Sequence, residues 1–215
     1  MSDKGTTRDK VLADIRDALK DVTRHVESVP LNNGLIFTKQ DEGLADGFTR
    51  VFTGIDGQLI RCENGQQLVT MLDGLIKQRN WTNVATRSHM LEQLGSLTNS
   101  TLVSDTIGNT ELEQVQVGIT DCEYLVARTG SIVMSTALPA GRAFPVYVPV
   151  HVVIAHESQL VYDLDDAILK MEQRYQDNYP SAWYLMSGPS RTGDIEKTLV
   201  LGVHGPVEVY VFLIK

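Results

Sequence analysis

The sequence predicts a three-layer α/β/α domain built around a mixed, largely parallel sheet. Short apolar strands alternate with helical patterns, which is the sequence sign of crossover units. The run from Val148 to Ala155 is almost continuously apolar, as expected of a strand covered on both faces. Hydrophobic residues make up 42% of the 215 residues, enough for one continuous core. We expect a helical arm over residues 1–28 and a single α/β domain over residues 29–215.

The first residues predict an amphipathic helix. Thr6 or Thr7 can cap it, and Val11, Leu12 and Ile15 follow at helical spacing. The arm can pack on its own domain or on a partner subunit. The breaker at residues 29–34 (VPLNNG) separates the arm from the α/β domain.

The rest of the chain divides into helices and strands by its periodicity. The first half reads as a helical segment over 44–52, a strand over 58–61, a helix over 65–77 capped by Asn64, a strand over 83–86, a helix over 89–94 and a strand over 101–104. The second half reads as a hairpin of strands over 123–127 and 131–135, a strand over 148–155, a helix over 163–175, a strand over 182–186, a helix over 194–199 and a last strand over 207–214.

Composition excludes several classes of protein. The formal net charge of −8 argues against a nucleic-acid binder, which normally shows a basic face. No apolar run reaches the length of a membrane span and no apolar signal region follows the polar start, so we expect a cytoplasmic protein. Cys62 and Cys122 read as reduced, at least partly buried thiols. Two cysteines cannot ligate an iron–sulfur cluster alone, no residues have metal-ligand spacing, and the sequence leaves any other cofactor unknown.

The segment SGPSRT is the strongest candidate for a ligand-binding loop. Its residues are Ser187, Gly188, Pro189, Ser190, Arg191 and Thr192. We expect it to lead into the helix over 194–199, whose free N–H groups and dipole suit a small anion. Arg191 adds a planar donor for a carboxylate or phosphate. The alternative is a plain capped turn, with Arg191 bonded to a neighbouring carboxylate.

Three further segments offer candidate side chains. In GVHGP, Gly202 and Gly205 flank an accessible His204, a weak candidate acid or base whose alternative is a structural histidine. In ARTGSI, the candidates Thr129, Gly130 and Ser131 can also form a simple hairpin turn. In GRAFPVYVPVH, Arg142 can point to a ligand, whereas we interpret His151 as a satisfied core residue.

Two stretches resemble a known family. Residues 118–164, with TGSIV, GRAFPVYVPVH and ESQLVYDL, and residues 187–206, SGPSRTGDIEKTLVLGVHGP, are similar to the LUD domain of lactate utilisation proteins. The resemblance implies a fold like that of the sugar-phosphate isomerases and CoA transferases (NagB/RpiA/CoA-transferase-like). It also implies a role in oxidising L-lactate to pyruvate, beside partner proteins that carry iron–sulfur clusters.

Three functions follow as hypotheses. The leading one is a non-iron–sulfur component of a lactate-oxidising system that binds a small anion or anionic cofactor at SGPSRT and GVHGP. The second is a stand-alone transferase or isomerase for a phosphorylated or CoA-linked substrate, with Glu196 as the weak candidate for its reactive carboxylate. The third is a structural assembly factor. No catalytic residue is securely assigned.

Overall fold

The fold is that of a computed structural model, which describes residues 7–20, 42–89, 100–102, 113–195, 198–202 and 204–215. The chain divides into two compact units, residues 1–39 and residues 40–215. The domain boundary expected at residue 28 falls outside the described residues, so it stays a prediction. The first unit contains the expected helix, α1 (Thr7–Lys20), on which Val11 and Ile15 are half exposed.

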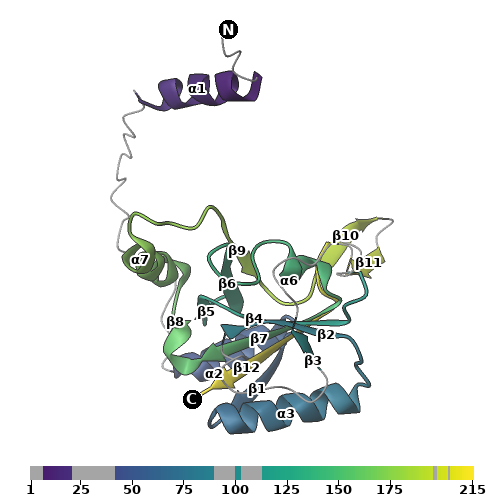
Figure 1. The fold of residues 1–215 in the computed structure, drawn as a ribbon. Coiled ribbons are helices and arrows are strands. Elements are labelled where there is room, and N and C mark those ends of the chain that lie inside the picture. The colour runs from purple at the N-terminus through teal and green to yellow at the C-terminus, as the bar shows by residue number, and fades with distance from the viewer. Residues whose placement is uncertain (1–6, 21–41, 90–99, 103–112, 196–197, 203) are drawn as a thin grey trace. The chain divides into compact units, whose positions relative to one another are not determined.

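The second unit is built on a parallel sheet of six strands, in the order β1-β12-β7-β4-β2-β3 (Figure 1). All of its neighbouring strands pair in parallel. The strands are β1 (Gln58–Cys62), β2 (Val84–Arg87), β3 (Ser100–Leu102), β4 (Val117–Asp121), β7 (Val150–His156) and β12 (Glu208–Ile214). The prediction of one mixed, largely parallel sheet is confirmed only in part, because this sheet is wholly parallel. Every β7 residue except the last is buried, as expected of a strand covered on both faces.

A second sheet and a hairpin complete the strands. The second sheet has the order β8-β5-β6-β9 and is mixed, since β8 pairs with β5 in parallel and the other pairs are antiparallel. Its strands are β5 (Tyr124–Val126), β6 (Ser131–Ser135), β8 (Leu160–Val161) and β9 (Trp183–Met186). The hairpin joins β10 (Arg191–Ile195) to β11 (Thr198–Leu201).

The layers differ from the expected arrangement of helices on both faces of one sheet. One face of the parallel sheet is covered by α3 (Gly65–Gln78), through Leu68, Leu72 and Ile76. The other face packs against α2 (Leu44–Gly54), α6 (Phe144–Tyr147) and the second sheet (Figure 1). Apolar residues of β5 and β6 occupy space that a helix was expected to fill. The remaining helices are α7 (Leu164–Tyr175) and the short 3-10 helix η1 (Glu157–Gln159).

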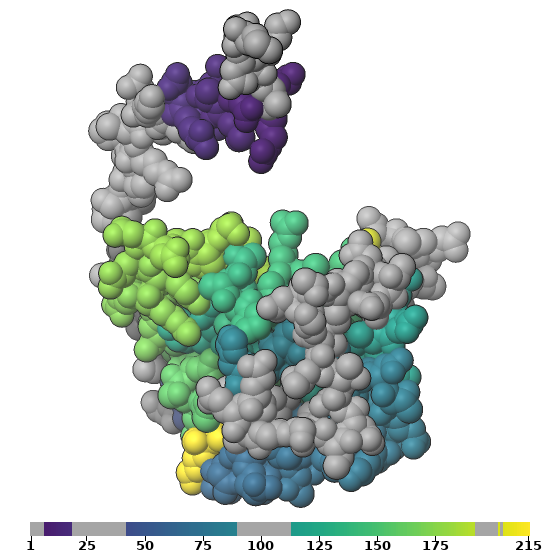
Figure 2. Space-filling view, viewed as in Figure 1, coloured from purple at the N-terminus to yellow at the C-terminus, as the bar shows by residue number. Residues whose placement is uncertain are grey.

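Local chemistry explains the helix boundaries that the sequence predicts. The Asn64 side chain accepts a hydrogen bond from the Gln67 N–H at 3.0 Å, as a capping residue does. Asp163 caps α7 in the same way, through the Leu164 N–H at 2.6 Å. In the space-filling view α3 and α7 lie at opposite ends of this unit (Figure 2).

The helix expected over 194–199 is wrong, because β10 and β11 pair as an antiparallel hairpin there. The β-branched residues Thr192, Ile195, Thr198 and Val200 favour strands, and Gly193 is a poor helix former. The helix expected over 89–94 lies almost wholly outside the described residues.

Sequence reasoning also overlooked some elements. It did not identify β4, β8 or α6, and of these β8 and α6 have only two and four residues. None of the helices within the described ranges combines the length and apolar character needed to cross a bilayer.

Candidate functional site

Hydrogen bonds join three of the four segments singled out by sequence, and the fourth, residues 141–151, lines the pocket beside them. The Ser190 N–H donates to the Pro206 carbonyl at 2.8 Å, and the Gly202 N–H donates to the Ser190 carbonyl at 3.1 Å. The hydroxyls of Ser131 and Ser187 lie 2.7 Å apart. We call residues 129–131, 187–191, 202 and 204–206 the loop cluster.

The loop cluster lies at the end of the parallel sheet where its strands begin, the amino ends of the strands. The Val207 N–H, just before β12, donates to the carbonyl of Pro149, just before β7, at 2.7 Å. Gly188 packs against Ile55, which precedes β1. Open α/β sheets usually bind ligands at the opposite end, beyond the carboxyl ends of the strands. The position of the loop cluster therefore gives no support of its own for a ligand site.

The chemistry expected at SGPSRT changes because no helix follows it. Arg191 opens β10, so the described backbone there presents a strand, without the free N–H groups of a helix start. Glu196 lies outside the described residues, as does residue 197. An anion at this loop would depend on side chains and on single backbone N–H groups.

Gly188 serves packing within the chain. Its φ of +74° lies in the left-handed region that favours glycine. A Cβ atom at this position would stand 2.5 Å from the Ile55 carbonyl oxygen. The close backbone approach that the sequence suggests is therefore an approach to the turn between α2 and β1.

Arg191 is paired with a carboxylate of its own chain. Its guanidinium forms an ion pair with Asp56, whose side chain is largely exposed. This is the arrangement expected for a plain structural turn. A ligand carboxylate or phosphate would have to replace Asp56 to bind Arg191.

We expect Arg191→Ala to lower the free energy of unfolding by less than about 1 kcal/mol, because exposed ion pairs contribute little. Urea melts of the purified chain would measure it. Asp56→Asn is the matched variant, since asparagine tolerates the φ of +63° at this position and only the charge is lost. A loss of several kcal/mol in either variant would show that the pair is a structural requirement.

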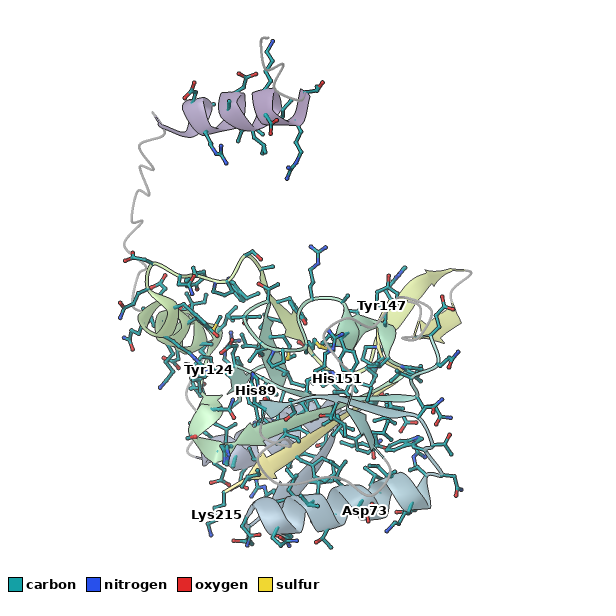
Figure 3. The ribbon with its side chains drawn as sticks, viewed as in Figure 1. Asp73, His89, Tyr124, Tyr147, His151 and Lys215 are labelled. Carbon is teal, nitrogen blue, oxygen red and sulfur yellow. The ribbon has the colours of Figure 1, made fainter. Side chains whose placement is uncertain are left out.

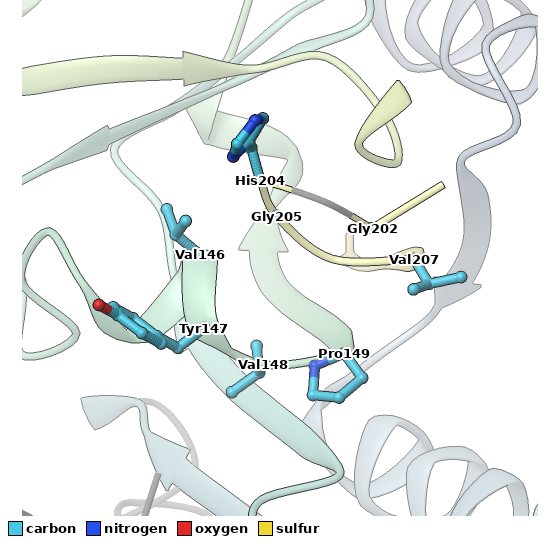
Figure 4. A pocket seen from close by; sticks show the side chains of 8 residues that line it. All are labelled: Val146, Tyr147, Val148, Pro149, Gly202, His204, Gly205 and Val207. Carbon is cyan, nitrogen blue, oxygen red and sulfur yellow. The ribbon is translucent and has the colours of Figure 1, made fainter. Parts of the chain in front are cut away.

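A pocket of about 520 Å³ opens beside the loop cluster. Its lining is mainly apolar, and the side chains around it are shown in Figure 4. The lining residues are Val146, Tyr147, Val148, Pro149, Gly202, His204, Gly205 and Val207. This size suits a small molecule, and His204 is exposed at its border, where an imidazole can donate or accept a hydrogen bond.

Hydroxyl groups form a chain within the loop cluster. Thr129 Oγ1 lies 2.8 Å from Ser131 Oγ, which in turn contacts Ser187. Gly130 has a φ of +62°, and a Cβ there would meet the backbone nitrogen of Phe52 at 2.9 Å. Arg142 is exposed just before α6, but it is not among the residues that line the pocket.

Sequence reasoning named His151 but missed its polar partner on the neighbouring strand, Thr120. His151 of β7 is completely buried, and its Nε2 lies 2.8 Å from the Thr120 hydroxyl of β4. Its Nδ1 has no hydrogen-bond partner among the described residues. The expected burial of His151 is confirmed, but the histidine is only half satisfied. Figure 3 labels His151, which belongs to β7, and Tyr147, which belongs to α6, at separate places.

Burial lowers the pKa of His151 from 6.5 to about 3. In the unfolded chain the His151 side chain is therefore protonated below about pH 6.5, whereas in the native state it stays neutral down to about pH 3. We expect the stability that His151 contributes to be complete above pH 6.5 and to fall as the pH drops, by up to about 1.4 kcal/mol per pH unit.

Urea melts of the native protein and of His151→Gln, between pH 7.5 and pH 4.5, would test this titration. The other ionisable groups are common to both proteins, so the difference between their stabilities should shrink as the pH falls. Parallel curves would contradict the prediction.

Glu123 is a second feature that the sequence did not reveal. Its carboxylate is fully buried and accepts hydrogen bonds from Ser135 Oγ at 2.6 Å, Tyr175 OH at 2.5 Å and Arg174 at 2.9 Å. Burial, followed by the bond to Glu123, raises the pKa of Tyr175. The Glu123 carboxylate thus links α7 to the second sheet. Its hydrogen bonds to three side chains suit a structural role.

Metal and thiol chemistry have no evident place in the described part of the chain. No group of three or more His, Cys, Asp or Glu side chains is arranged to hold a metal ion there. Cys62 and Cys122 are both buried and unbridged, which confirms the expected burial. Burial raises the pKa of both thiols, so neither is an activated nucleophile.

Comparison with known proteins matches the LUD domain to residues 106–214, just over half of the chain. The lactate utilization protein C of Bacillus velezensis is 36% identical over 105 residues, which cover 48% of this chain and 44% of that protein. The lactate utilization protein C of Bacillus subtilis is 33% identical over 105 residues, with the same coverage. The matched region spans less than half the length of these relatives.

A solved structure supports the fold. The crystal structure of a DUF162 family protein from Deinococcus radiodurans superposes with a TM-score of 0.60. The superposition covers 80% of this chain and 96% of that one, at 15% sequence identity. At this identity, the likeness establishes a shared fold alone.

Proposed function

Since this chain belongs to the LUD domain family, we propose that it is a non-iron–sulfur component of an L-lactate utilisation system. Support comes from relatives named lactate utilization protein C, at 36% and 33% identity over about half of this chain. In the proposed role, lactate is oxidised to pyruvate in the cytoplasm by the assembled system. Partner proteins that carry iron–sulfur clusters would transfer the electrons, since two buried cysteines cannot hold a cluster.

Within this role, we propose that the loop cluster binds a small anion or an anionic cofactor. The observation that carries the proposal is the meeting of three loops distant in sequence beside one pocket of about 520 Å³. His204 borders the pocket, and the cluster supplies the hydroxyls of Thr129, Ser131 and Ser187. Arg191 would exchange Asp56 for the anion on binding.

Growth and binding together test the proposal. A strain without this protein should fail to grow on L-lactate, and the native chain should restore growth. His204→Ala and Arg191→Ala should restore it poorly, although both fold. In a thermal-shift screen of L-lactate, pyruvate, phosphate and nucleotides, at least one compound should raise the melting temperature of the native chain. Both variants should lose that response. Normal growth of the deletion strain would contradict the role.

An assembly factor is the second candidate function, and exposed apolar residues favour it. Val146, Tyr147 and Val207 are 41%, 63% and 41% exposed and gather at the same pocket. Exposed apolar patches often mark protein contacts. Purification of partners with the native chain but not with Tyr147→Ser, together with full function of Arg191→Ala, would favour this candidate over anion binding.

A stand-alone transferase or isomerase gains less support. This candidate rests on the fold that the family resemblance implies, which is like that of the sugar-phosphate isomerases and CoA transferases. Such an enzyme would need a reactive carboxylate, and the described lining of the pocket contains none. Turnover of a phosphorylated or CoA-linked substrate by the purified chain would restore this candidate.

A further inference from the structure

Three polar side chains share one face of three neighbouring strands. They are Arg87 of β2, Thr120 of β4 and His151 of β7. The strand register aligns Arg87 with Thr120, and the Thr120 hydroxyl contacts His151 Nε2 at 2.8 Å. Ala85 and Val153, which have the same side-chain direction by strand alternation, belong to the core on the face that carries α6 and the second sheet.

Two of these side chains have unused hydrogen-bonding atoms. Within the described residues, neither His151 Nδ1 nor Arg87 Nε has a partner, although both atoms are buried. When Thr120 donates its hydroxyl proton to Nε2, Nδ1 carries the ring proton and becomes a free donor. Buried polar atoms normally have partners, so these two require an explanation.

The guanidinium of Arg87 is held by an aromatic ring. Its central carbon lies 5.0 Å from the centre of the Phe144 ring, and the side chain is only partly exposed. No described carboxylate forms an ion pair with it. Arginine is seldom buried without an anionic partner. The partly buried guanidinium of Arg87 therefore suits the binding of an anion.

The topology places Arg87 and Thr120 where α/β sheets bind ligands, whereas His151, the second residue of β7, is aligned with Gly118 and lies closer to the amino ends of the strands. Within the parallel sheet, the strand that follows β2 in the sequence is β3, on one side of the β2–β4 pair, and the strand that follows β4 is β7, on the other side. The carboxyl ends of β2 and β4 are therefore a topological switch point, where a crevice forms in open α/β sheets. Arg87 ends β2, and Thr120 is the penultimate residue of β4.

We propose that Arg87, Thr120 and His151 form a binding site for a small carboxylate at this switch point. One planar guanidinium matches one carboxylate in charge and geometry. The Nδ1–H of His151 adds a second hydrogen-bond donor, and the Thr120 hydroxyl, which donates its proton to Nε2, positions the imidazole ring. Asp121, the next residue of β4, accepts hydrogen bonds from Ser88 and from the His89 N–H, and strand alternation directs it to the other face. The site is separate from the loop cluster and does not rest on the function proposed there.

Nuclear magnetic resonance of the full, ¹⁵N-labelled chain tests this site directly. The Nε–H signal of Arg87, identified by its absence in Arg87→Lys, should shift and saturate as acetate is added at constant ionic strength. Arg87→Gln should raise the Kd for acetate at least about tenfold, measured from backbone signals of β2 and β4. Arg87→Lys keeps the charge but lacks the planar fork, so it should weaken binding as well.

Arg79→Gln is the matched control. Arg79 also stacks over an aromatic ring, with its central carbon 5.6 Å from the centre of the Trp81 ring, and the variant removes the same charge. It should leave the Kd for acetate unchanged.

Three results would overturn the proposal. The first is an Arg87 signal that does not respond to acetate in the native chain, which needs no variant to fold. The second is tighter binding of inorganic phosphate than of acetate at the same signals. The third is acetate binding that Arg191→Ala abolishes and Arg87→Gln retains, which would locate the anion at the loop cluster and leave the proposed function intact.

Discussion

Replacing Glu123 by alanine is expected to lower the free energy of unfolding by about 3 kcal/mol. The substitution removes a fully buried acceptor and leaves the hydroxyls of Ser135 and Tyr175 without their partner. Arg174 is half exposed and can turn to water, which keeps the loss below that of a completely buried ion pair. Urea unfolding at pH 7 would measure the change.

Glu172→Ala is the control for Glu123→Ala. Glu172 lies exposed on the same helix, α7, that Glu123 fastens to the second sheet. Its loss should change stability by no more than about 0.5 kcal/mol, as is usual for surface positions. Equal effects of the two substitutions would show that the buried carboxylate contributes nothing specific.

Gly188→Ala is expected to cost about 3 kcal/mol, from two separate causes. The left-handed backbone at a φ of +74° disfavours any residue with a Cβ, by about 1–2 kcal/mol. In addition, the new methyl group would collide with the Ile55 carbonyl oxygen, and the backbone there cannot yield as a flexible side chain does. The chain should also lose stability at the turn between α2 and β1, which amide hydrogen exchange would detect.

Gly141→Ala separates the two causes. Gly141 has a similar φ of +58°, but apart from its own residue and its two chain neighbours no described atom would lie within 4 Å of a Cβ there. This variant should show the backbone cost alone, about 1–2 kcal/mol. If Gly188→Ala costs no more than Gly141→Ala, the loop has room to move away from Ile55.

The candidate site could be predicted only in part. The sequence shows that SGPSRT and GVHGP have unusual turn chemistry, and the two loops do contact each other through Ser190. It does not show that Gly188 faces Ile55 or that Arg191 pairs with Asp56, because both partners lie more than 130 positions away in the chain. The segment after Arg191 was misjudged because its charged residues resemble a first helical turn, whereas the β-branched residues decided its pairing.

The sequence by itself determined the class of this protein. Helical spacing, capping residues such as Asn64 and the apolar run of β7 are local signals, and they suffice for most elements and for the parallel sheet. The LUD motifs identified the family in the same way.

Only the tertiary structure decided which residues meet. It brought Arg87, Thr120 and His151 onto one face, buried Glu123 beneath α7 and placed the loop cluster at the amino ends of the parallel strands. Strand order and register depend on packing between distant segments, and no local pattern specifies them. For that reason the sequence pointed to the glycine-containing loops, whereas the contacts between polar side chains inside the strands could be found only from the fold.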